Sequence, residues 1–264
     1  MKNDDDLMGH WQGVVETRFA YCPVCGIHGV FRSYAPQEFP CKRNDFICQH
    51  CTSVGRNRHV AIAVLDIFKT RTSAASLTDF ALNFEGALYI TCVKEAVYEA
   101  VKTGKNVVSS EYVDGVEPGT FKNGILCQDI QRTTFHDNSF DLIITEDVLE
   151  HVPAPERAFN EIRRILRPGG YHISTIPVSW DQEVSFARAK LKDGDVVHLV
   201  EPEYHGDPFR PEGVLAFTTY GRDIVERFCS LIGPSEILSA HGDKFYESVF
   251  AIYNSWVFVS RKIG

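Results

Sequence analysis

The stretch FHDNSFDLIITEDVLEHVPAPERAFNEIRRILRPGGYHISTIP, residues 135–177, decides the fold class. Its run 140–145 is almost wholly apolar, which is typical of a central parallel strand covered on both faces. Residues 155–166 place apolar side chains at helical spacing, and a Pro-Gly-Gly turn separates them from a second strand at 171–177. A strand, a helix and a strand in this order predict a parallel β-α-β unit.

The same alternation extends to both sides of this unit. Further strands are expected at 87–92, 106–110, 125–128 and 253–260, with a helix at 94–102. The pattern predicts an α/β fold over about residues 79–264, with a doubly wound, Rossmann-like and mostly parallel sheet of seven strands. Residues 178–215 interrupt it with charged, Pro- and His-containing sequence, and this segment, the cap, is interpreted as an insertion.

Two cysteine pairs near the N-terminus predict a metal site. Cys22 and Cys25 form one CxxC pair, Cys48 and Cys51 form the other, and 22 residues separate the pairs. Each CxxC turn presents two thiolates, so two turns complete the tetrahedral shell of a structural Zn²⁺ ion. Two disulfides or a redox CxxC are the alternatives. Further nearby donors that can replace a ligand are Cys41 and His50.

The N-terminal part is therefore divided into three segments. Residues 1–20 are expected to be a flexible lead-in, 21–55 a zinc ribbon, and 56–78 a connecting helix with a linker. The lead-in lacks a basic start followed by an apolar run, so no signal peptide is expected. No run of 18 apolar residues is present, so no membrane contact is expected either. These features favour a cytoplasmic protein.

Composition narrows the function classes. The chain has 264 residues, 44% of them hydrophobic, and 27 Lys and Arg against 35 Asp and Glu give a net charge of −8. This balance disfavours a protein that binds nucleic-acid backbones. The ribbon with its helix, Cys22–Thr70, carries six Lys and Arg against three Asp and Glu, which is only +3. The sequence does not indicate an oligomeric state.

Residues 135–177 closely resemble the post-core region of class I S-adenosylmethionine-dependent methyltransferases of the UbiE/UbiG-like type, methyltransferase type 11. The pieces that carry the resemblance are DNSFDLI, the DVLEHV loop, an amphipathic helix and LRPGG. Over about residues 20–262 the chain resembles a bacterial subgroup with an N-terminal zinc ribbon, an SEY-x-DG segment (110–115) and a PEYHGDP segment (202–208). The resemblance implies a methyltransferase that uses S-adenosylmethionine, and it names no acceptor.

The loop after the first strand departs from the wider family pattern E-x-G-x-G-x-G. Residues 89–95 read YITCVKE and contain no glycine. S-adenosylmethionine has no phosphates, so a cradle of backbone N–H groups is not obligatory. The resemblance implies that the subgroup uses a glycine-poor loop with an acidic end, where Glu95 pairs with the ammonium group of the cofactor.

Carboxylates stand at the ends of successive predicted strands, which is where α/β sheets bind ligands. Glu111, beside Tyr112, can accept hydrogen bonds from both ribose hydroxyls. Asp129 can hold the adenine amine while the backbone N–H of Ile130 meets a ring nitrogen. The remaining predicted cofactor contacts are Thr91, Cys92, Thr145 and Glu146.

Two histidines are the candidate bases, because a hydroxyl acceptor must lose its proton during methyl transfer. They are His151 in the LEH segment and His205 in the cap, and His151 can instead be a structural loop residue. Arg56 and Arg58 can hold an anionic substrate or the cofactor carboxylate, or simply begin a solvated helix. The predicted substrate contacts are Tyr204, Asp207, Arg56 and Arg58. An alternative second metal site comprises His198, Glu201, Glu203, His205 and Asp207.

Three functions fit these observations. The favoured one is O-methylation of a sugar, polysaccharide or secondary-metabolite hydroxyl, with a small-molecule or glycan substrate and zinc in a structural role. A ribbon followed by a methyltransferase domain also describes certain RNA methyltransferases. The third is a repurposed domain with a degenerate cofactor site that does not transfer methyl groups.

Overall fold

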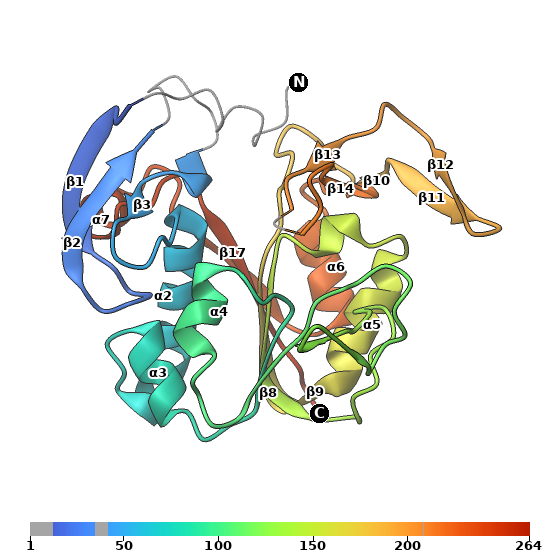
Figure 1. The fold of residues 1–264 in the computed structure, drawn as a ribbon, viewed down its shortest axis with the longest axis horizontal. Coiled ribbons are helices and arrows are strands. Elements are labelled where there is room, and N and C mark those ends of the chain that lie inside the picture. The colour runs from blue at the N-terminus through green and yellow to red at the C-terminus, as the bar shows by residue number, and fades with distance from the viewer. Residues whose placement is uncertain (1–12, 35–41, 208) are drawn as a thin grey trace.

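The computed structural model of the protein describes residues 13–34, 42–207 and 209–264 (Figure 1). Its centre is a six-stranded mixed sheet with the order β16-β17-β9-β8-β4-β5. The four strands β5, β4, β8 and β9 are parallel, while β17 runs antiparallel to both β9 and β16. The bounds are Leu88–Ile90 (β4), Val107–Ser109 (β5), Phe140–Glu146 (β8), Leu166–Thr175 (β9), Ser235–Ser239 (β16) and Trp256–Arg261 (β17).

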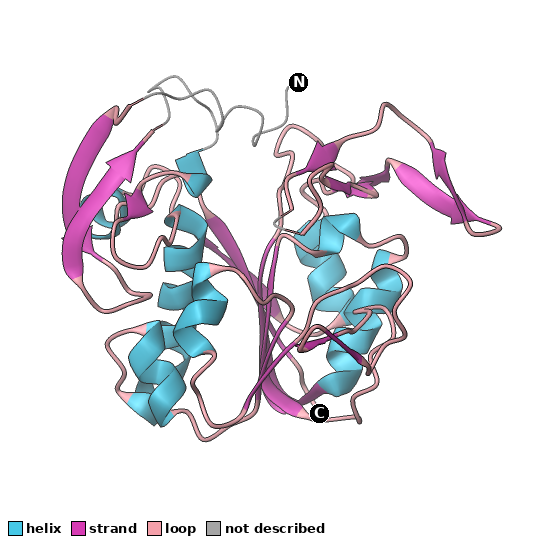
Figure 2. Ribbon diagram, viewed as in Figure 1, coloured by secondary structure: helices cyan, strands magenta, loops and turns pink. Residues whose placement is uncertain are grey.

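Helices cover both faces of this sheet (Figure 2). Alternate residues of β8 point to opposite sides, so Leu142 and Ile144 join one apolar cluster and Ile143 joins the other. The first cluster includes α2 (Gly55–Thr72), α3 (Leu77–Asn83) and α4 (Ala96–Val101), and the second includes α5 (Pro155–Ile165) and α6 (Ile224–Leu231). The doubly wound α/β architecture is therefore confirmed. In the expected connecting segment 56–78, α2 continues to Thr72 and α3 begins at Leu77, so the linker is confined to residues 73–76.

The expected seventh strand is not part of this sheet. Within 125–128, Ile125–Leu126 (β7) pairs antiparallel with Phe121–Lys122 (β6). Asn123 and Gly124 form the intervening turn with φ values of 52° and 79°, which favours a two-residue hairpin. The segment reaches the main sheet only through the parallel bridge Glu111↔Cys127. Residues 125–126 therefore pair with β6 in a local hairpin and do not form the expected parallel strand of the main sheet.

The N-terminal segment, called the ribbon below, forms a three-stranded antiparallel sheet that shares the core of the main domain. Its strands are Glu16–Tyr21 (β1), His28–Ser33 (β2) and Ile47–Cys48 (β3), and Lys42–Asn44 form the short helix η1. Its buried residues Val24, Phe31 and Phe46 belong to the same apolar cluster as α2 and the main sheet. The expectation of a flexible lead-in over 1–20 is wrong for residues 16–20, because they lie in β1. Residues 1–12 and Cys41 lie outside the described part of the chain.

The cap consists of short antiparallel pairs. Ala189–Lys192 (β11) pairs with Asp195–His198 (β12), and Tyr204–His205 (β13) pairs with Val214–Leu215 (β14). The pairing continues beyond residue 215, since Phe186–Ala187 (β10) pairs with Thr218–Thr219 (β15). The remaining elements are the short helix Leu149–His151 (η2) and Lys244–Phe250 (α7). No helix in the described part of the chain is long and apolar enough to cross a bilayer.

Candidate active site

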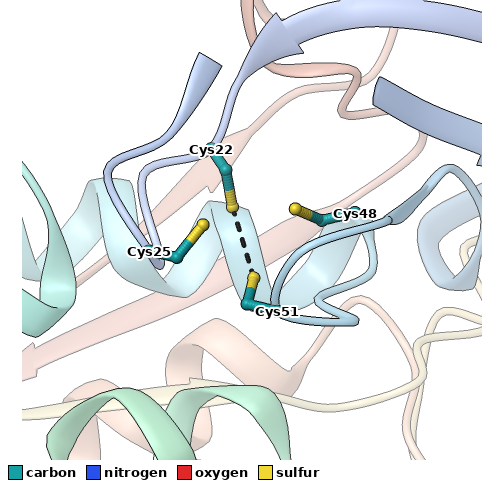
Figure 3. Close-up of side chains that lie close together, drawn as sticks. All are labelled: Cys22, Cys25, Cys48 and Cys51. Atoms are coloured by element: carbon teal, nitrogen blue, oxygen red, sulfur yellow. Dashed lines mark hydrogen bonds between the residues drawn. The ribbon is translucent and has the colours of Figure 1, made fainter. Parts of the chain in front are cut away.

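Four thiols gather between the two turns of the ribbon and point toward one another (Figure 3). The sulfurs of Cys22, Cys25, Cys48 and Cys51 all lie within 4.8 Å of one another, and Sγ of Cys22 is 3.6 Å from Sγ of Cys51. A tetrahedral Zn²⁺ with Zn–S bonds of about 2.3 Å separates its sulfurs by roughly 3.8 Å. The four residues therefore fit a structural zinc ion. His50 is exposed and is not part of this group.

The electrostatics of the four thiols also favour a bound cation. Burial and the charge of Cys22 raise the pKa of Cys25 to about 12. Hydrogen bonds from Cys51 to Cys22 and Cys48 hold the pKa of the Cys51 thiol far above its usual range. Several thiolates so close together repel one another, so full ionisation requires a positive charge at the centre. Zinc supplies that charge, and the donor set is the one that it prefers.

Arg58 was predicted to contact the substrate, but in the structure its side chain is buried and binds backbone carbonyls. Its side chain is completely buried and stacks on Phe31 with a distance of 4.7 Å from the guanidinium carbon to the ring centre. Its guanidinium donates to the carbonyls of Ser53 (2.6 Å), Phe250 (2.8 Å) and Ala251 (2.7 Å). Burial lowers the pKa of Arg58 to about 10. With its donors committed to the backbone, Arg58 joins the ribbon to the end of α7.

The carboxyl ends of β4 and β8 meet the first turn of α2, where charged side chains fill the junction. The guanidinium of Arg56 lies 3.1 Å from Oε1 of Glu95 and 3.3 Å from Oδ2 of Asp147. Arg43 of η1 also pairs with Asp147. Both Glu95 and Arg56 are thus at the edge of the sheet where a cofactor was expected, and they are paired with each other.

Asn57 connects the same turn of α2 to Glu146 at the end of β8. Its Nδ2 donates to Oε1 of Glu146 at 2.7 Å and to Oε2 of Glu95 at 3.4 Å. Its Oδ1 accepts from the backbone N–H of Val54 at 3.0 Å, which fixes the orientation of the amide. Burial raises the pKa of Glu146 to about 7, although the Arg56 guanidinium acts in the opposite direction. Glu146 can therefore exchange a proton near neutral pH.

The loop after β4 carries side chains where many class I enzymes have glycines. Thr91 is buried and its backbone N–H donates to the carbonyl of Ile144 at 3.2 Å. Cys92 is half-buried, and burial raises the pKa of its thiol. Thr145 was also predicted to contact the cofactor, but its buried hydroxyl lies 3.0 Å from Nε2 of His172 inside the sheet. Its side chain is therefore part of the core.

Glu111, Tyr112 and Asp129 form a second group of candidate cofactor residues. The bridge to Cys127 brings Glu111 beside the end of β7. Burial and the nearby Asp207 carboxylate raise the pKa of Glu111 to about 7. A cavity of about 200 Å³ is lined by Tyr112 and Asp129 among other residues, and Oδ1 of Asp129 accepts from the backbone N–H of Gln131 at 2.9 Å. Ile130 follows Asp129 and is buried in the second apolar cluster.

The two candidate bases come together across the η2 segment and the cap. The rings of His151 and His205 have centroids 4.9 Å apart. Oε1 of the buried Glu150 lies 3.7 Å from Nε2 of His151 and 3.7 Å from Nδ1 of His205. Nδ1 of His151 lies 2.9 Å from the carbonyl oxygen of Leu215 and therefore carries a proton, so Nε2 is the nitrogen of this ring that can accept one. The two histidines that the sequence offered as alternative bases thus lie next to each other.

His205 is an acid at neutral pH rather than a base. Burial opposes its charged form, but the hydrogen bond with Glu203 at 3.2 Å and the nearby Glu150 carboxylate outweigh this effect and raise the pKa of His205 to about 10. The residues expected to orient His205 have other partners. Asp207 pairs with Arg210 at 3.3 Å, and Tyr204 is exposed. The orienting groups are the carboxylates Glu150 and Glu203 instead.

The proposed five-residue metal set of the cap does not assemble. Among the residues that the structure describes, the compact group of donors in this region comprises Glu150, His151 and His205. His198, Glu201 and Asp207 are absent from that group. They lie on different short segments of the cap, and their spacing in the sequence had no rigid frame behind it.

Three residues of this region were missed by the sequence analysis as site residues. They are Arg43, Asn57 and Glu150. Glu150 had a usable signal, since it stands next to His151 directly after a buried strand. Arg43 and Asn57 had none, because they come from the ribbon and α2, about 90 residues or more before the strand end that they contact.

Comparison with known protein families finds a match to the part of the chain that contains β4 and β8. A family model described as "Methyltransferase domain" matches residues 86–174. This match covers about a third of the chain, and the matched segment is called the methyltransferase-like segment below. It runs from just before β4 almost to the end of β9, so it contains the ends of β4 and β8 and the Glu150–His151 pair. The ribbon, α2 and the cap lie outside it.

The chain is also similar, over short stretches, to curated proteins. A phosphoethanolamine N-methyltransferase of Caenorhabditis elegans is 40% identical over 42 residues, or 16% of this chain and 10% of that protein. A sterol 24-C-methyltransferase of Gibberella zeae is 43% identical over 42 residues, or 16% and 11%. The matches thus span only about a tenth of these relatives. A solved S-adenosylmethionine-dependent methyltransferase from Mesorhizobium loti aligns with a TM-score of 0.42 and 13% identity over 67% of this chain and 91% of that chain.

Proposed function

We propose that this protein transfers the methyl group of S-adenosylmethionine to a hydroxyl of a small molecule or glycan. The proposal is supported by the methyltransferase-like segment and by acid–base groups beside the end of β8. The observation that carries it is the pair formed by Glu150 and His151, in which Nδ1 of His151 donates to a carbonyl and Nε2 lies 3.7 Å from Oε1 of Glu150 as the nitrogen that can accept a proton. A base of this kind is what a hydroxyl acceptor requires.

The cofactor is expected to lie along the carboxyl edge of the sheet, where α/β folds bind ligands. Glu111 would accept hydrogen bonds from the ribose hydroxyls, with Tyr112 against the adenine. Asp129 and the backbone of Ile130 would hold the adenine edge. Supporting this arrangement, Tyr112 and Asp129 line one cavity, and Glu111 lies beside it at the bridge to Cys127.

The reaction is a direct displacement. The acceptor oxygen forms a bond to the methyl carbon, and the bond between carbon and sulfur breaks with its electron pair left on sulfur. The hydroxyl proton goes to Nε2 of His151, and S-adenosylhomocysteine leaves. Alignment of oxygen, carbon and sulfur supplies a large part of the rate in such reactions. The carboxyl group of Glu150, 3.7 Å from both histidine rings, is placed to stabilise the imidazolium formed on His151.

Cofactor binding is the first test. Titration calorimetry of the zinc-loaded protein with S-adenosylhomocysteine should give a micromolar Kd, and Asp129→Ala should weaken it about tenfold, which is the loss of one or two hydrogen bonds. Asp195→Ala, which removes an exposed carboxylate of the cap, is the matched control and should bind like the parent. No binding by the parent at millimolar ligand would refute a methyltransferase function.

Acceptor class is the second test. Transfer of a labelled methyl group from S-adenosylmethionine should be measured with monosaccharides, oligosaccharides and phenols, and with total RNA as the competing class. His151→Gln should lower the rate with the active acceptor by about 10²–10⁴ while leaving S-adenosylhomocysteine affinity unchanged. The exposed His50→Gln is the control. Labelling of RNA, with affinity that falls steeply with salt, would instead favour the RNA methyltransferase alternative. Binding without transfer to any acceptor would favour the repurposed domain.

A further inference from the structure

The first turn of α2 lies where a class I cofactor loop would normally meet the methionine end of its ligand. This turn belongs to the helix that follows the ribbon directly, and not to the methyltransferase-like segment. Through Arg56 and Asn57 it contacts the loop after β4 at Glu95 and the end of β8 at Glu146. The loop of the methyltransferase-like segment contains no glycine here. Side chains from outside this segment thus occupy the methionine end of the expected cofactor site.

Close backbone packing holds this turn in place. A Cβ atom on Gly55 would lie 2.8 Å from the backbone carbonyl oxygen of Arg43, so only glycine allows η1 to approach α2 this closely. Two residues earlier, the hydroxyl of Ser53 lies 3.3 Å from Sγ of Cys22 and 3.2 Å from Sγ of Cys51. The position of Arg56 is therefore set by the same short segment that packs against the thiol cluster.

Unpaired buried polar atoms mark this junction as incomplete. Among the described residues, Oγ1 of Thr91 and Oε2 of Glu146 are buried without a hydrogen-bond partner. Thr91 and Glu146 are 8% and 7% exposed, so bulk water does not reach these two atoms. Such atoms are rare in native proteins, and two of them at the ends of neighbouring strands indicate a polar ligand.

The charges of the junction fit one particular kind of ligand. Three carboxylates, Glu95, Glu146 and Asp147, face two guanidinium groups, Arg43 and Arg56. With every group ionised, one positive charge is missing. The amino-acid end of S-adenosylmethionine with its sulfonium carries two positive charges and one negative charge, which sum to the missing +1. A buried cluster is most stable when its charges are balanced and hydrogen-bonded.

We propose that the first turn of α2 forms the site for the amino-acid end of the cofactor. Arg56 binds the cofactor carboxylate, and Glu95 and Glu146 bind the ammonium group. Asn57 orients the two acids through its amide. The zwitterionic ligand separates the Arg56–Glu95 pair. The cofactor carboxylate then replaces Glu95 as the partner of Arg56, and the cofactor ammonium group replaces Arg56 as the partner of Glu95. This assignment rests on the proposed function, because it places the same cofactor.

A ligand that lacks the amino-acid end separates this proposal from a structural role of Arg56. 5′-Methylthioadenosine keeps the nucleoside and the sulfur but has neither the carboxylate nor the ammonium group. Calorimetry should compare its binding with that of S-adenosylhomocysteine in the parent, Arg56→Met and Arg56→Lys. Arg32→Met, an exposed arginine of the same ribbon, is the control for charge and folding. Zinc content and thermal midpoint are measured for each variant.

The expected result is a ligand-specific loss. Arg56→Met should weaken S-adenosylhomocysteine binding by about 10–100-fold, because a charge-assisted hydrogen bond is lost. It should change 5′-methylthioadenosine binding less than about threefold. Arg56→Lys keeps the charge and should lose less, again with only S-adenosylhomocysteine affected.

Other outcomes overturn the proposal in distinguishable ways. Equal losses with both ligands would show that Arg56 acts on the fold and not on the amino-acid end. An unchanged S-adenosylhomocysteine affinity in a folded Arg56→Met variant would show that the carboxylate binds elsewhere. If Arg56→Met does not fold, the same comparison in Arg56→Lys decides. If the parent binds neither ligand, the proposed function itself fails, and this assignment fails with it.

Discussion

The ribbon and the cap stand at the same end of the main sheet, on opposite sides of it, and they are built in opposite ways (Figure 1). The ribbon shares one apolar cluster with the main sheet and α2, and it is joined to the rest of the chain by the buried Arg58. The cap has strands of two to four residues and exposes apolar side chains such as Leu191, Val196 and Leu199. Segments with few buried apolar contacts open locally at low free energy.

This difference fits a division of labour between cofactor and acceptor. A cofactor is the same molecule in every turnover, so a rigid binding site for it does not have to adapt to different ligands. An acceptor must enter and leave, and a weakly packed cap permits this movement. The ribbon borders the Glu95–Glu146 junction, and the cap borders the His151–His205 pair. Three experiments test this difference between the ribbon and the cap.

Loss of the ribbon metal should have the largest effect. Removal of zinc by a chelator, or Cys48→Ser, should lower the thermal midpoint by roughly 10 °C or more, because metal binding energy in such sites is folding energy. Since Cys22 and Cys48 are part of the main apolar cluster, the change should spread to α2. Calorimetry or circular dichroism measures the midpoint. Cys229→Ser, at an exposed position outside the cluster, should leave it unchanged. A zinc-free protein with the parent midpoint would contradict the prediction.

Replacement of one arginine at the ribbon and one in the cap should give the next largest effect, measured as a loss in the free energy of unfolding. Arg58→Met leaves three backbone carbonyls without their donor and should lower the free energy of unfolding by about 3–5 kcal/mol. Arg188 of the cap pairs with Glu203 at 3.1 Å nearer the solvent, and Arg188→Met should cost about 1 kcal/mol. Urea unfolding measures both. Equal losses would show that the cap is as firmly integrated as the ribbon.

The pH dependence of cofactor affinity should give the smallest effect. A cation bound beside Glu146 lowers the pKa of this acid from about 7, so binding releases a proton and affinity rises with pH. Between pH 5.5 and pH 7 the affinity for S-adenosylmethionine should increase about tenfold and then level off. The groups that face Glu146 are Arg56, Asn57, Glu95, Asp147 and the thiol of Cys92. Calorimetry over this range measures the slope. Glu146→Gln should remove it, and an unaltered slope in that variant would assign the proton to another group.

The sequence predicted those features that depend on local spacing. Two CxxC pairs predicted the thiol cluster, and the run 140–145 predicted the central strand. Where it failed, a competing local or distant interaction decided the structure. The turn at Asn123 and Gly124 drew residues 125–126 into a hairpin, so the seventh strand was lost.

Charged residues were harder to place than apolar ones. Arg56 and Arg58 are two positions apart and have the same chemistry in the sequence, yet one faces the sheet edge and the other is sealed against the carbonyls of Phe250 and Ala251. The carbonyl partners of Arg58 at the end of α7 lie 192 and 193 residues later in the sequence, and no local sequence pattern predicts them. For the same reason the contact of Asn57 with Glu146 could not be foreseen. The hydrophobic pattern of a segment determines whether it forms a helix, whereas the packing of that helix determines which residues each side chain contacts.

The contact between Arg58 and the end of α7 also has a consequence for synthesis. On the ribosome the ribbon emerges early, and its four thiols can take up metal while most of the chain is still unmade. The carbonyls of Phe250 and Ala251 that receive Arg58 come 192 and 193 residues later. Contacts over such separations form late in folding. The thiol cluster can therefore assemble well before the contact between Arg58 and the end of α7 completes the fold.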